Sequence, residues 1–424
     1  MSVQETRLRE IADAIRAKEG STEPIPANAF ASRILALEMN RLPEGTHTIN
    51  LQASDPEGGT VVGGGVASDG MTVTVNAEAA DGYEFKGWQE DGETVSADIQ
   101  YTFPVHGSRN LIAGFSMPQY EAGIDWWTAS LPSPALWYGI TYGGGKFVAV
   151  AYTTIAAYSN DGINWTATTL PSSANWRSVA YGAGKFVAIS YKSNMAAYSI
   201  DGVTWTKTSL PLTPFPTGST STWWSVAYGD GRFVAITREN NVAAYSDDGI
   251  SWTKVELPMT KDWRDITYGD GKFVAVATVT NTAIYSADGI TWQWTNLPSS
   301  TNWYSVAYGA GRFVALAGGS KGNMAAYSSD GVTWTIATLP SSTAYWYDVT
   351  YGGGKFVAVG GNTNTAAYSR DGVVWTMVTL PSPDPYGSWS NLSYGDGKFV
   401  ALAHGTSSSM SSKVAYSCST GPGA

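Results

Sequence analysis

The sequence predicts a mainly β protein, in which a seven-bladed β-propeller follows a helical segment and a small β domain. Two observations carry this prediction. The 424 residues are 13% aromatic and include 47 glycines but only 14% charged residues, a composition that favours strands and tight turns over helical bundles. The motif YGxG[KR]F also occurs seven times, beginning at Tyr142, Tyr181, Tyr228, Tyr268, Tyr308, Tyr351 and Tyr394.

The repeat has the length and the strand content of a propeller blade. Its copies begin 39 to 47 residues apart, and a tryptophan stands five positions before each initial tyrosine. Each unit contains four short strand-like runs, which in the second unit are RSVAY, KFVAIS, AAYS and VTWTKTS. A period of about 40–50 residues with four strands per unit is typical of β-propellers. Seven copies over residues 119–424 therefore predict seven blades.

The seventh repeat stops before its last strand. Residues 415–424 read AYSCSTGPGA, whereas the same run continues into an Asp-Gly pair and a tryptophan in the six earlier copies. An incomplete blade would leave the ring open and expose a sheet edge. The segment EAGIDWWTASLP, residues 121–132, aligns with the missing half. We therefore expect it to supply the outer strand of the seventh blade and to close the ring.

Residues 1–40 are predicted to form a helical segment. Leu8, Ile11 and Ile15 have helical spacing, and so do the apolar residues of the stretch 30–37. Two helices this short cannot bury enough surface to fold alone. The segment is therefore either a cap packed on the next domain or an element for anchoring and oligomerisation.

Residues 41–118 alternate in polarity as strands do, for example in THTINLQA and MTVTVNAEA. The run GYEFKGWQEDGETVS, followed by YTFPV and RNLIAGF, resembles the divergent internalin-type B-repeat of bacterial surface proteins and phage structural proteins. The resemblance implies a small β-grasp-like spacer domain without chemistry of its own. It assigns core and turn roles to Gly82, Tyr83, Phe85, Gly87, Trp88, Tyr101, Phe103 and Phe115.

The six complete YSxDGxxW elements of the propeller resemble the Asp-box of sialidases and of many non-enzymatic propellers, with one residue fewer between Asp and Gly. The resemblance implies a structural turn that lies away from any active site. Each glycine can take a positive φ, and the tryptophan would pack the outer strand. The basic residue of each YGxG[KR]F motif is expected to pair with the aspartate of this turn or to face solvent.

The loops at the two ends of the blades differ in how strongly they vary. The turns between strands 1 and 2 and between strands 3 and 4 are nearly identical in every repeat, whereas the other connections differ each time. Variable loops on a rigid frame are where binding residues concentrate. The residue after each repeat tryptophan varies in the same way and should line the mouth of the central channel. The candidate ligand-binding residues are Tyr138, Arg177, Trp224, Arg264, Tyr304 and Tyr347, with Ser390 in the seventh repeat.

The propeller has few residues suited to glycoside hydrolysis. Such enzymes use a pair of carboxylates, or a tyrosine activated by one, with arginines to hold an acidic sugar. The propeller has three glutamates, six arginines and one histidine, His404, and six of its aspartates belong to the turns. We therefore expect no enzyme, no catalytic residue, no metal site and no cofactor. A glycan hydrolase is the less favoured alternative.

Charge and hydropathy limit the classes of partner and the location that we expect for this protein. The net charge is −10, of which −9 falls in residues 1–118 and −1 in residues 119–424, so no nucleic-acid partner is expected. The sequence has no run of about 18 apolar residues, and its first 20 residues lack an apolar signal core. We therefore expect neither membrane insertion nor signal-peptide secretion. The single cysteine, Cys418, is consistent with synthesis in a reducing cytoplasm.

The N-terminal run LREIADAIRAKEGSTEPIPANAFASRILAL resembles the helical segment that begins many tail and fibre proteins of phages. The resemblance implies a virion protein made in the host cytoplasm, most simply a homo-oligomeric tail-fibre or receptor-binding protein. Residues 1–40 would contact other virion proteins, and the propeller would bind a host cell-surface glycan or protein. The alternative is a head-decoration or collar protein with only generic adhesion.

Overall fold

The computed structural model describes residues 45–80, 83–117, 120–212, 222–318, 322–361, 364–383, 388–405 and 410–420. The chain divides into two compact units, Met1–Gln119 and Tyr120–Ala424. The sequence predicted a boundary one residue earlier. The helical segment predicted over residues 1–40 lies outside the described residues. Within the described part, the secondary structure is strand and turn, and no helix is long and apolar enough to span a membrane.

The first unit contains two sheets. The five-stranded sheet has the order β3-β1-β8-β5-β6, and the three-stranded sheet has the order β2-β4-β7. β1 and β8 pair in parallel, and the other pairs are antiparallel. The strands are β1 (Thr46–Ala53), β2 (Gly59–Val62), β3 (Gly65–Ser68), β4 (Thr72–Ala79), β5 (Glu84–Glu90), β6 (Glu93–Ser96), β7 (Gln100–Pro104) and β8 (Arg109–Ser116).

The two sheets of this unit share one apolar core. Trp88, Leu111 and Phe115 from the larger sheet pack with Val75 and Phe103 from the smaller one. The core roles predicted for the aromatic residues of this segment are therefore present in the structure. Two sheets without a helix in the described part differ, however, from a β-grasp, in which a sheet packs against a helix.

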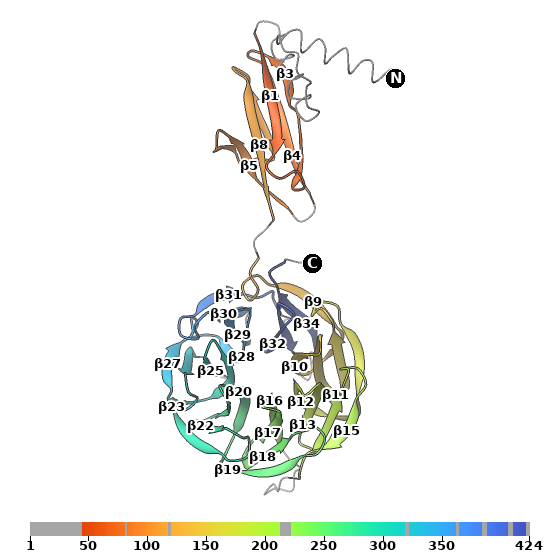
Figure 1. Cartoon of the computed structure of the whole chain (residues 1–424), viewed down its shortest axis with the longest axis vertical. Coiled ribbons are helices and arrows are strands. Elements are labelled where there is room, and N and C mark those ends of the chain that lie inside the picture. The colour runs from red at the N-terminus through yellow and green to blue at the C-terminus, as the bar shows by residue number, and fades with distance from the viewer. Residues whose placement is uncertain are drawn as a thin grey trace, which may run out of the picture. The chain divides into compact units, whose positions relative to one another are not determined.

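The second unit is built from antiparallel sheets arranged in a ring (Figure 1), with the first strand of each repeat toward the centre and the fourth at the rim. The first two repeats share a six-stranded sheet, because β11 and β12 each run through two consecutive strands of the repeat pattern. Its strands are β10 (Trp137–Gly143), β11 (Lys146–Ser159), β12 (Thr166–Gly182), β13 (Lys185–Tyr191), β14 (Met195–Ser199) and β15 (Thr206–Ser209).

Four further sheets have four strands each, in chain order. They contain β16 (Trp223–Gly229), β17 (Arg232–Thr237), β18 (Asn240–Ser246) and β19 (Thr253–Lys261); β20 (Trp263–Gly269), β21 (Lys272–Ala277), β22 (Thr280–Ser286) and β23 (Gln293–Thr301); β24 (Trp303–Gly309), β25 (Arg312–Ala317), β26 (Met324–Ser328) and β27 (Thr335–Thr338); and β28 (Tyr345–Gly352), β29 (Lys355–Gly361), β30 (Thr365–Ser369) and β31 (Thr376–Thr379).

The last sheet joins the two ends of the unit. β32 (Ser388–Gly395), β33 (Lys398–His404) and β34 (Ser411–Ser417) are followed in space by β9 (Trp127–Ala135), which pairs antiparallel with β34. The closing strand thus begins at Trp127, later than the segment 121–132 suggested, because the residues before it form a turn. In that turn Gly123 has φ +88°, and its N–H donates to Ser417 Oγ at 2.6 Å.

Contacts between neighbouring repeats continue around the whole ring. The glycine after each motif tyrosine lies directly against the motif tyrosine of the next repeat. The last of these contacts joins Gly395 to Tyr142 and so returns to the first repeat. The repeat tryptophans are fully buried, and Trp137 shares a core cluster with Leu402 of the last repeat. The uniform residues of the repeat therefore build the frame.

Candidate functional site

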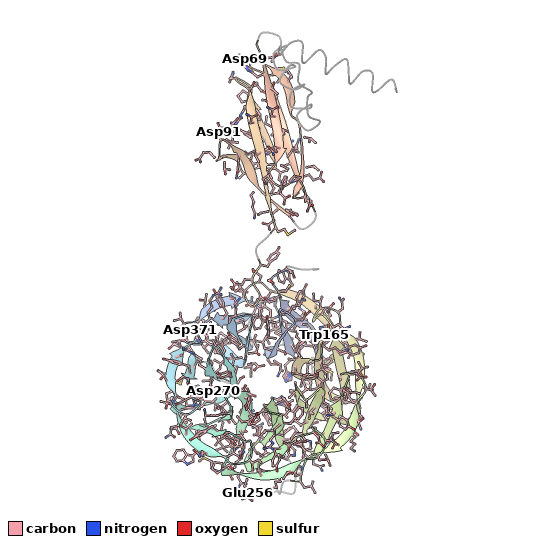
Figure 2. The ribbon with its side chains drawn as sticks, in the orientation of Figure 1. Asp69, Asp91, Trp165, Glu256, Asp270 and Asp371 are labelled. Carbon is pink, nitrogen blue, oxygen red and sulfur yellow. The ribbon has the colours of Figure 1, made fainter. Side chains whose placement is uncertain are left out.

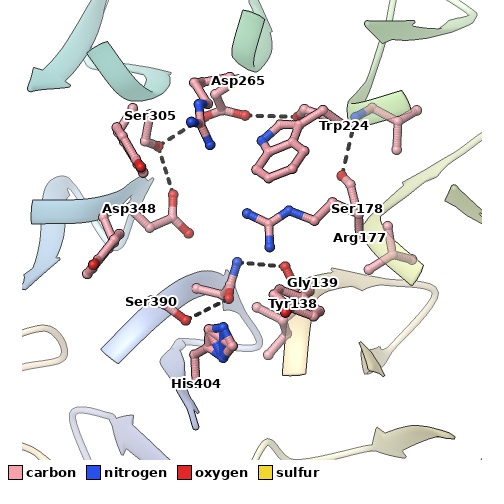
Figure 3. A pocket seen from close by; sticks show the side chains of 18 of the residues that line it. Tyr138, Gly139, Arg177, Ser178, Trp224, Asp265, Ser305, Asp348, Ser390 and His404 are labelled. Carbon is pink, nitrogen blue, oxygen red and sulfur yellow. Dashed lines mark hydrogen bonds between the residues drawn. The ribbon is translucent and has the colours of Figure 1, made fainter. Parts of the chain in front are cut away.

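A central cavity of about 510 Å³ is lined by first-strand residues from all seven repeats. Figure 3 shows this cavity from close by. The structure brings all of the predicted ligand-binding residues together here, and each of their side chains is half-buried. The lining includes Tyr138, Arg177, Trp224, Arg264, Tyr304, Tyr347 and Ser390.

A β-bulge in the first hairpin of each repeat accounts for this convergence. The pairing register shifts immediately after the repeat tryptophan in all seven hairpins, as between Trp223 and Ser225. A bulge leaves one residue unpaired and re-aims the side chains around it. The tryptophan stays in the core, and the extra residue, Trp224 in the third repeat, faces the cavity. Variation at the bulged position therefore changes the cavity while the frame stays the same.

Trp224 is the centre of a cluster of arginines and aromatic rings. The guanidinium carbons of Arg177, Arg238 and Arg264 lie 3.8, 4.3 and 4.9 Å from the centre of its ring. Arg177 also lies over Tyr138 at 4.6 Å, so it is held between two rings. Stacking of a cation on an aromatic face is favourable by about 0.5–2 kcal/mol.

Two further residues of this cluster were not found from the sequence. Arg238 lies in the connection between β17 and β18, and Tyr191 is the last residue of β13. The Tyr191 ring packs edge-on against Trp224 at 5.1 Å. The sequence marked the connections between strands 2 and 3 as variable but gave no indication of which side chains in or beside them pack against Trp224.

Asp262 pairs with two of the three arginines. Arg238 donates to both of its carboxylate oxygens at 2.5 and 2.9 Å, and Arg264 Nη2 lies 3.1 Å away. Burial raises the pKa of Asp262, but the hydrogen bond from Arg238 and the two positive charges outweigh it and hold the pKa below its usual value. Burial lowers the pKa of Arg177 to about 10, and repulsion from Arg264 and Arg238 adds to this effect.

A pair of carboxylates forms another part of the wall. Ser305 Oγ lies 3.0 Å from Asp265 Oδ2 and 2.8 Å from Asp348 Oδ1, so it bridges the two (Figure 3). Removal from water, followed by the charge of Asp265, raises the pKa of Asp348 to about 7, and the pKa of Asp265 is raised by the same removal from water. A hydroxyl has one proton to donate. A protonated Asp348 that donates to Ser305, with Ser305 donating to Asp265, satisfies all three groups.

These carboxylates belong to a belt of hydrogen bonds between repeats, formed by the second residue after the repeat tryptophan in every repeat except the first, where this residue is Gly139. Asp265 accepts from Val306 N at 2.9 Å, and Asp348 accepts from Leu392 N at 2.7 Å, each in the next repeat. Asn391 donates to Tyr138 O at 2.8 Å. The sequence analysis missed this belt, although a small or polar residue at the position in every repeat was a visible signal. The belt joins neighbouring repeats, and its residues also line the cavity.

The Asp-Gly turns are structural, as the sequence predicted. In the first copy Ser159 Oγ donates to Asp161 Oδ1 at 2.8 Å, and the same oxygen accepts from Ile163 N and Asn164 N. Burial raises the pKa of Asp161, but the hydrogen bonds outweigh it and lower the pKa to about 2. Gly162 has φ +74°. Figure 2 labels Trp165 and Asp371 from two of these copies.

Some basic residues of the YGxG[KR]F motifs have carboxylate partners outside the Asp-Gly turns. Arg232 Nε donates to Asp247 Oδ1 at 2.6 Å, and Lys398 lies 3.6 Å from Asp396 in its own motif. Arg232 also contacts the aspartate of an Asp-Gly turn, because its Nη1 donates to the backbone oxygen of Asp288 at 2.6 Å. The expected contact with the turn is therefore present for Arg232, but it is made to the backbone.

The chemistry available in the cavity favours binding. The histidine among its lining residues, His404, packs edge-on against Tyr138, and burial lowers its pKa to about 4. No group of three or more His, Cys, Asp or Glu residues suited to a metal ion occurs in the described part of the chain. What the cavity does offer is the guanidiniums of Arg177 and Arg264 and several aromatic faces in one place.

Comparison with solved structures defines the fold class of the second unit as a β-propeller. Streptogramin B lyase has a TM-score of 0.59 and 12% identity, with 69% of this chain and 97% of that chain covered. Virginiamycin B lyase from Staphylococcus aureus has a TM-score of 0.59 and 13% identity, with 69% of this chain and 99% of that chain covered. YCF48 bound to D1 peptide has a TM-score of 0.54 and 16% identity, with 72% of this chain and 99% of that chain covered. At these identities the likeness concerns the fold alone, although the neighbours include an enzyme.

The first unit has a family match of its own. Residues 49–119 match the model of the divergent InlB B-repeat domain, in agreement with the resemblance seen in the sequence. No curated protein matches the chain.

Proposed function

We propose that this protein is a receptor-binding protein of a phage virion, and that its propeller binds a host cell-surface glycan in the central cavity. The observation that carries the proposal is the convergence of Tyr138, Arg177, Trp224 and Tyr304 on one cavity, from a position that varies between the repeats among tyrosine, arginine, tryptophan and serine. Aromatic faces stack on sugar rings, and a cavity of about 510 Å³ lies within the range of ordinary ligand sites.

The architecture proposed for this function has seven blades, with the shared six-stranded sheet counted as two. Residues 1–40 would join the protein to other virion proteins and to further copies of itself. The B-repeat-like domain would act as a spacer, and several propellers on one particle would strengthen binding by avidity. This role is that of a binding module and not of an enzyme.

A second role uses the same architecture. A head-decoration or collar protein would adhere generically and would have no need for a specific cavity. The variation at the bulged position favours the receptor-binding role, since generic adhesion gives no reason for tyrosine, arginine, tryptophan and serine to replace one another between otherwise uniform repeats. A glycan hydrolase is favoured less, although Asp265 and Asp348 supply two carboxylates.

The test is binding of the full chain to a panel of intact bacteria and their extracted wall glycans, with release of reducing sugar measured in the same wells. Saturable, strain-selective binding without release is the expected result. Trp224→Ala should abolish it. The matched control Trp294→Ala, which removes a tryptophan on β23 that is 54% exposed, should leave it unchanged. Release of sugar would favour the hydrolase, and binding to no strain would favour the architectural role.

A further inference from the structure

We infer that the central cavity binds an oxyanion, namely a carboxylate, sulfate or phosphate group carried by the glycan, and that Arg177 is its main contact. This inference rests on the proposed function, because it names the chemical class of the glycan. The observation behind it is the positive charge of Arg177, which has no counter-ion among the described residues.

Arg177 is a partly buried cation with a stacking environment and no anionic partner. Among the described residues, no carboxylate forms an ion pair with Arg177, and none accepts a hydrogen bond from its guanidinium. Its side chain extends toward the middle of the cavity beside Trp224 (Figure 3). The rings of Trp224 and Tyr138 cover its faces and leave the N–H groups at its edge as the available donors. Five N–H donors in a planar fork match the geometry of carboxylate and phosphate groups.

The carboxylates in and around the cavity are engaged elsewhere. Asp262 is paired with Arg238 and Arg264. Asp265 accepts hydrogen bonds from Ser225, from Ser305 and from two backbone N–H groups. Asp348 is joined to the same belt. Their lone pairs are therefore occupied within the protein, and the charge of Arg177 remains available to a ligand.

Arg264 provides a second donor near the same ring. Its Nε is buried and has no hydrogen-bond partner in the described structure, and its side chain is 14% exposed. Asp262 and Glu239, whose Oε1 lies 3.5 Å from Arg238 Nη2, balance the two positive charges of Arg238 and Arg264. The charge that stays unbalanced in this cluster is therefore that of Arg177. An oxyanion beside Trp224 would receive hydrogen bonds from Arg177, and charge-assisted bonds of this type are the stronger ones.

A purely structural role for Arg177 predicts different behaviour. If the stacking between Trp224 and Tyr138 served only the frame, Arg177→Gln would lower the melting temperature and anions would have no effect on it. If the position is kept for a ligand, Arg177→Gln should melt no lower than wild type, because an unpaired, partly desolvated charge is costly to fold. Phosphate should then raise the melting temperature of the wild type and not of the variant.

The decisive experiment is calorimetric titration of the full chain at low salt. The probes are inorganic phosphate, a disaccharide that carries one glucuronate, and the same disaccharide with glucose in its place. The acidic disaccharide should bind at least about tenfold more tightly than the neutral one, and Arg177→Gln should weaken it by roughly 30-fold or more. Arg177→Lys should retain part of the affinity. The control Arg312→Gln removes an arginine that lies over Tyr327 in the fifth repeat, and it should change nothing.

The outcomes separate the inference from the proposed function. Equal affinity for both disaccharides, unchanged in Arg177→Gln, would overturn the oxyanion site while strain-selective binding to cells could still stand. Binding of phosphate and of the acidic disaccharide through Arg177, without binding to any bacterial surface, would support the site and overturn the receptor role. Loss of every binding signal in the wild type would overturn both.

Discussion

The closure of the ring predicts a measurable role for one ion pair. Lys355 Nζ donates to Glu121 Oε1 at 2.6 Å and to Ala122 O at 2.8 Å, and the lysine side chain is only 3% exposed. In another repeat, Arg232 donates in the same way to the backbone oxygen of Asp288. The bond to Ala122 therefore repeats a contact that Arg232 makes, whereas Glu121 adds ion pairs with Lys355 and with Arg370 Nη2, which lies 2.5 Å from Glu121 Oε1, at the closing turn.

Glu121→Ala should lower the free energy of unfolding of the propeller by about 1–2 kcal/mol. Removing one partner of a fully buried pair costs about 3–5 kcal/mol. The cost is smaller here, because Glu121 is 42% exposed and Lys355 keeps its bond to Ala122. For a unit of this size, the melting temperature should fall by about 2–5 °C.

Thermal and urea unfolding of the full chain, followed by tryptophan fluorescence, measure this effect. Asp396→Ala is the matched control, since its carboxylate is 56% exposed and lies 3.6 Å from Lys398; it should cost less than about 0.5 kcal/mol. The hydrogen bond from Lys355 lowers the pKa of Glu121. The contribution of the pair is therefore present above about pH 4.5 and is lost as the pH falls through the lowered pKa. Equal effects of the two substitutions at pH 7 would refute the reasoning.

Three further changes test the frame and the carboxylate pair. Ser417→Ala removes a buried hydroxyl from the turn that the two ends of the propeller form together, and it should lower the free energy of unfolding in urea by about 1–3 kcal/mol. Ser286→Ala should cost the same in a turn formed by one continuous segment. A cost near zero for Ser417→Ala alone would show that the two turns are not equivalent. Gly143→Ala would place a Cβ atom 2.0 Å from Tyr181 Cγ, so folded protein should be lost in gel filtration and circular dichroism, and a normal yield would count against this contact. Removal from water raises the pKa of Asp348 to about 7, so its contribution to stability is complete below about pH 4 and is lost as the pH rises through 7, by at most about 4 kcal/mol. The free energy of unfolding should therefore change less with pH between about pH 4 and 7 in Asp348→Asn than in the wild type. An equal dependence on pH in the two proteins would show that another group titrates.

The sequence was sufficient to predict the class of fold, because the features that define a blade all lie within one repeat. Alternating strands, a fixed period and positive-φ glycines in the Asp-Gly turns are all visible within one unit. The candidate binding position was also visible, since one variable residue follows a tryptophan that never changes. The role of the glycine after the motif tyrosine was not visible in the sequence. Its contact with the next repeat, such as Gly143 against Tyr181, depends on packing between units.

The parts that sequence reasoning missed involve residues far apart in the chain. Glu121 and Lys355 are 234 positions apart, and nothing in either local pattern indicates the pair. Asp265 and Asp348 looked like ordinary strand residues, because their environment is created by the neighbouring repeats. Arg238 lies in a connection whose conformation no repeat pattern specifies. Period and composition describe one unit well, whereas charges inside the ring depend on how the units meet.

The bulge after each repeat tryptophan explains how one frame can hold a specific and electrostatically costly site. The paired residues on either side of the bulge, the buried tryptophans and the glycine–tyrosine contacts hold every repeat to its neighbours. The bulged side chain takes part in none of these contacts. A cation such as Arg177 can therefore stand without a counter-ion, because the closed ring supplies the stability that the unpaired charge removes. The same separation means that a new side chain at this position should change the lining of the cavity and leave the ring unchanged.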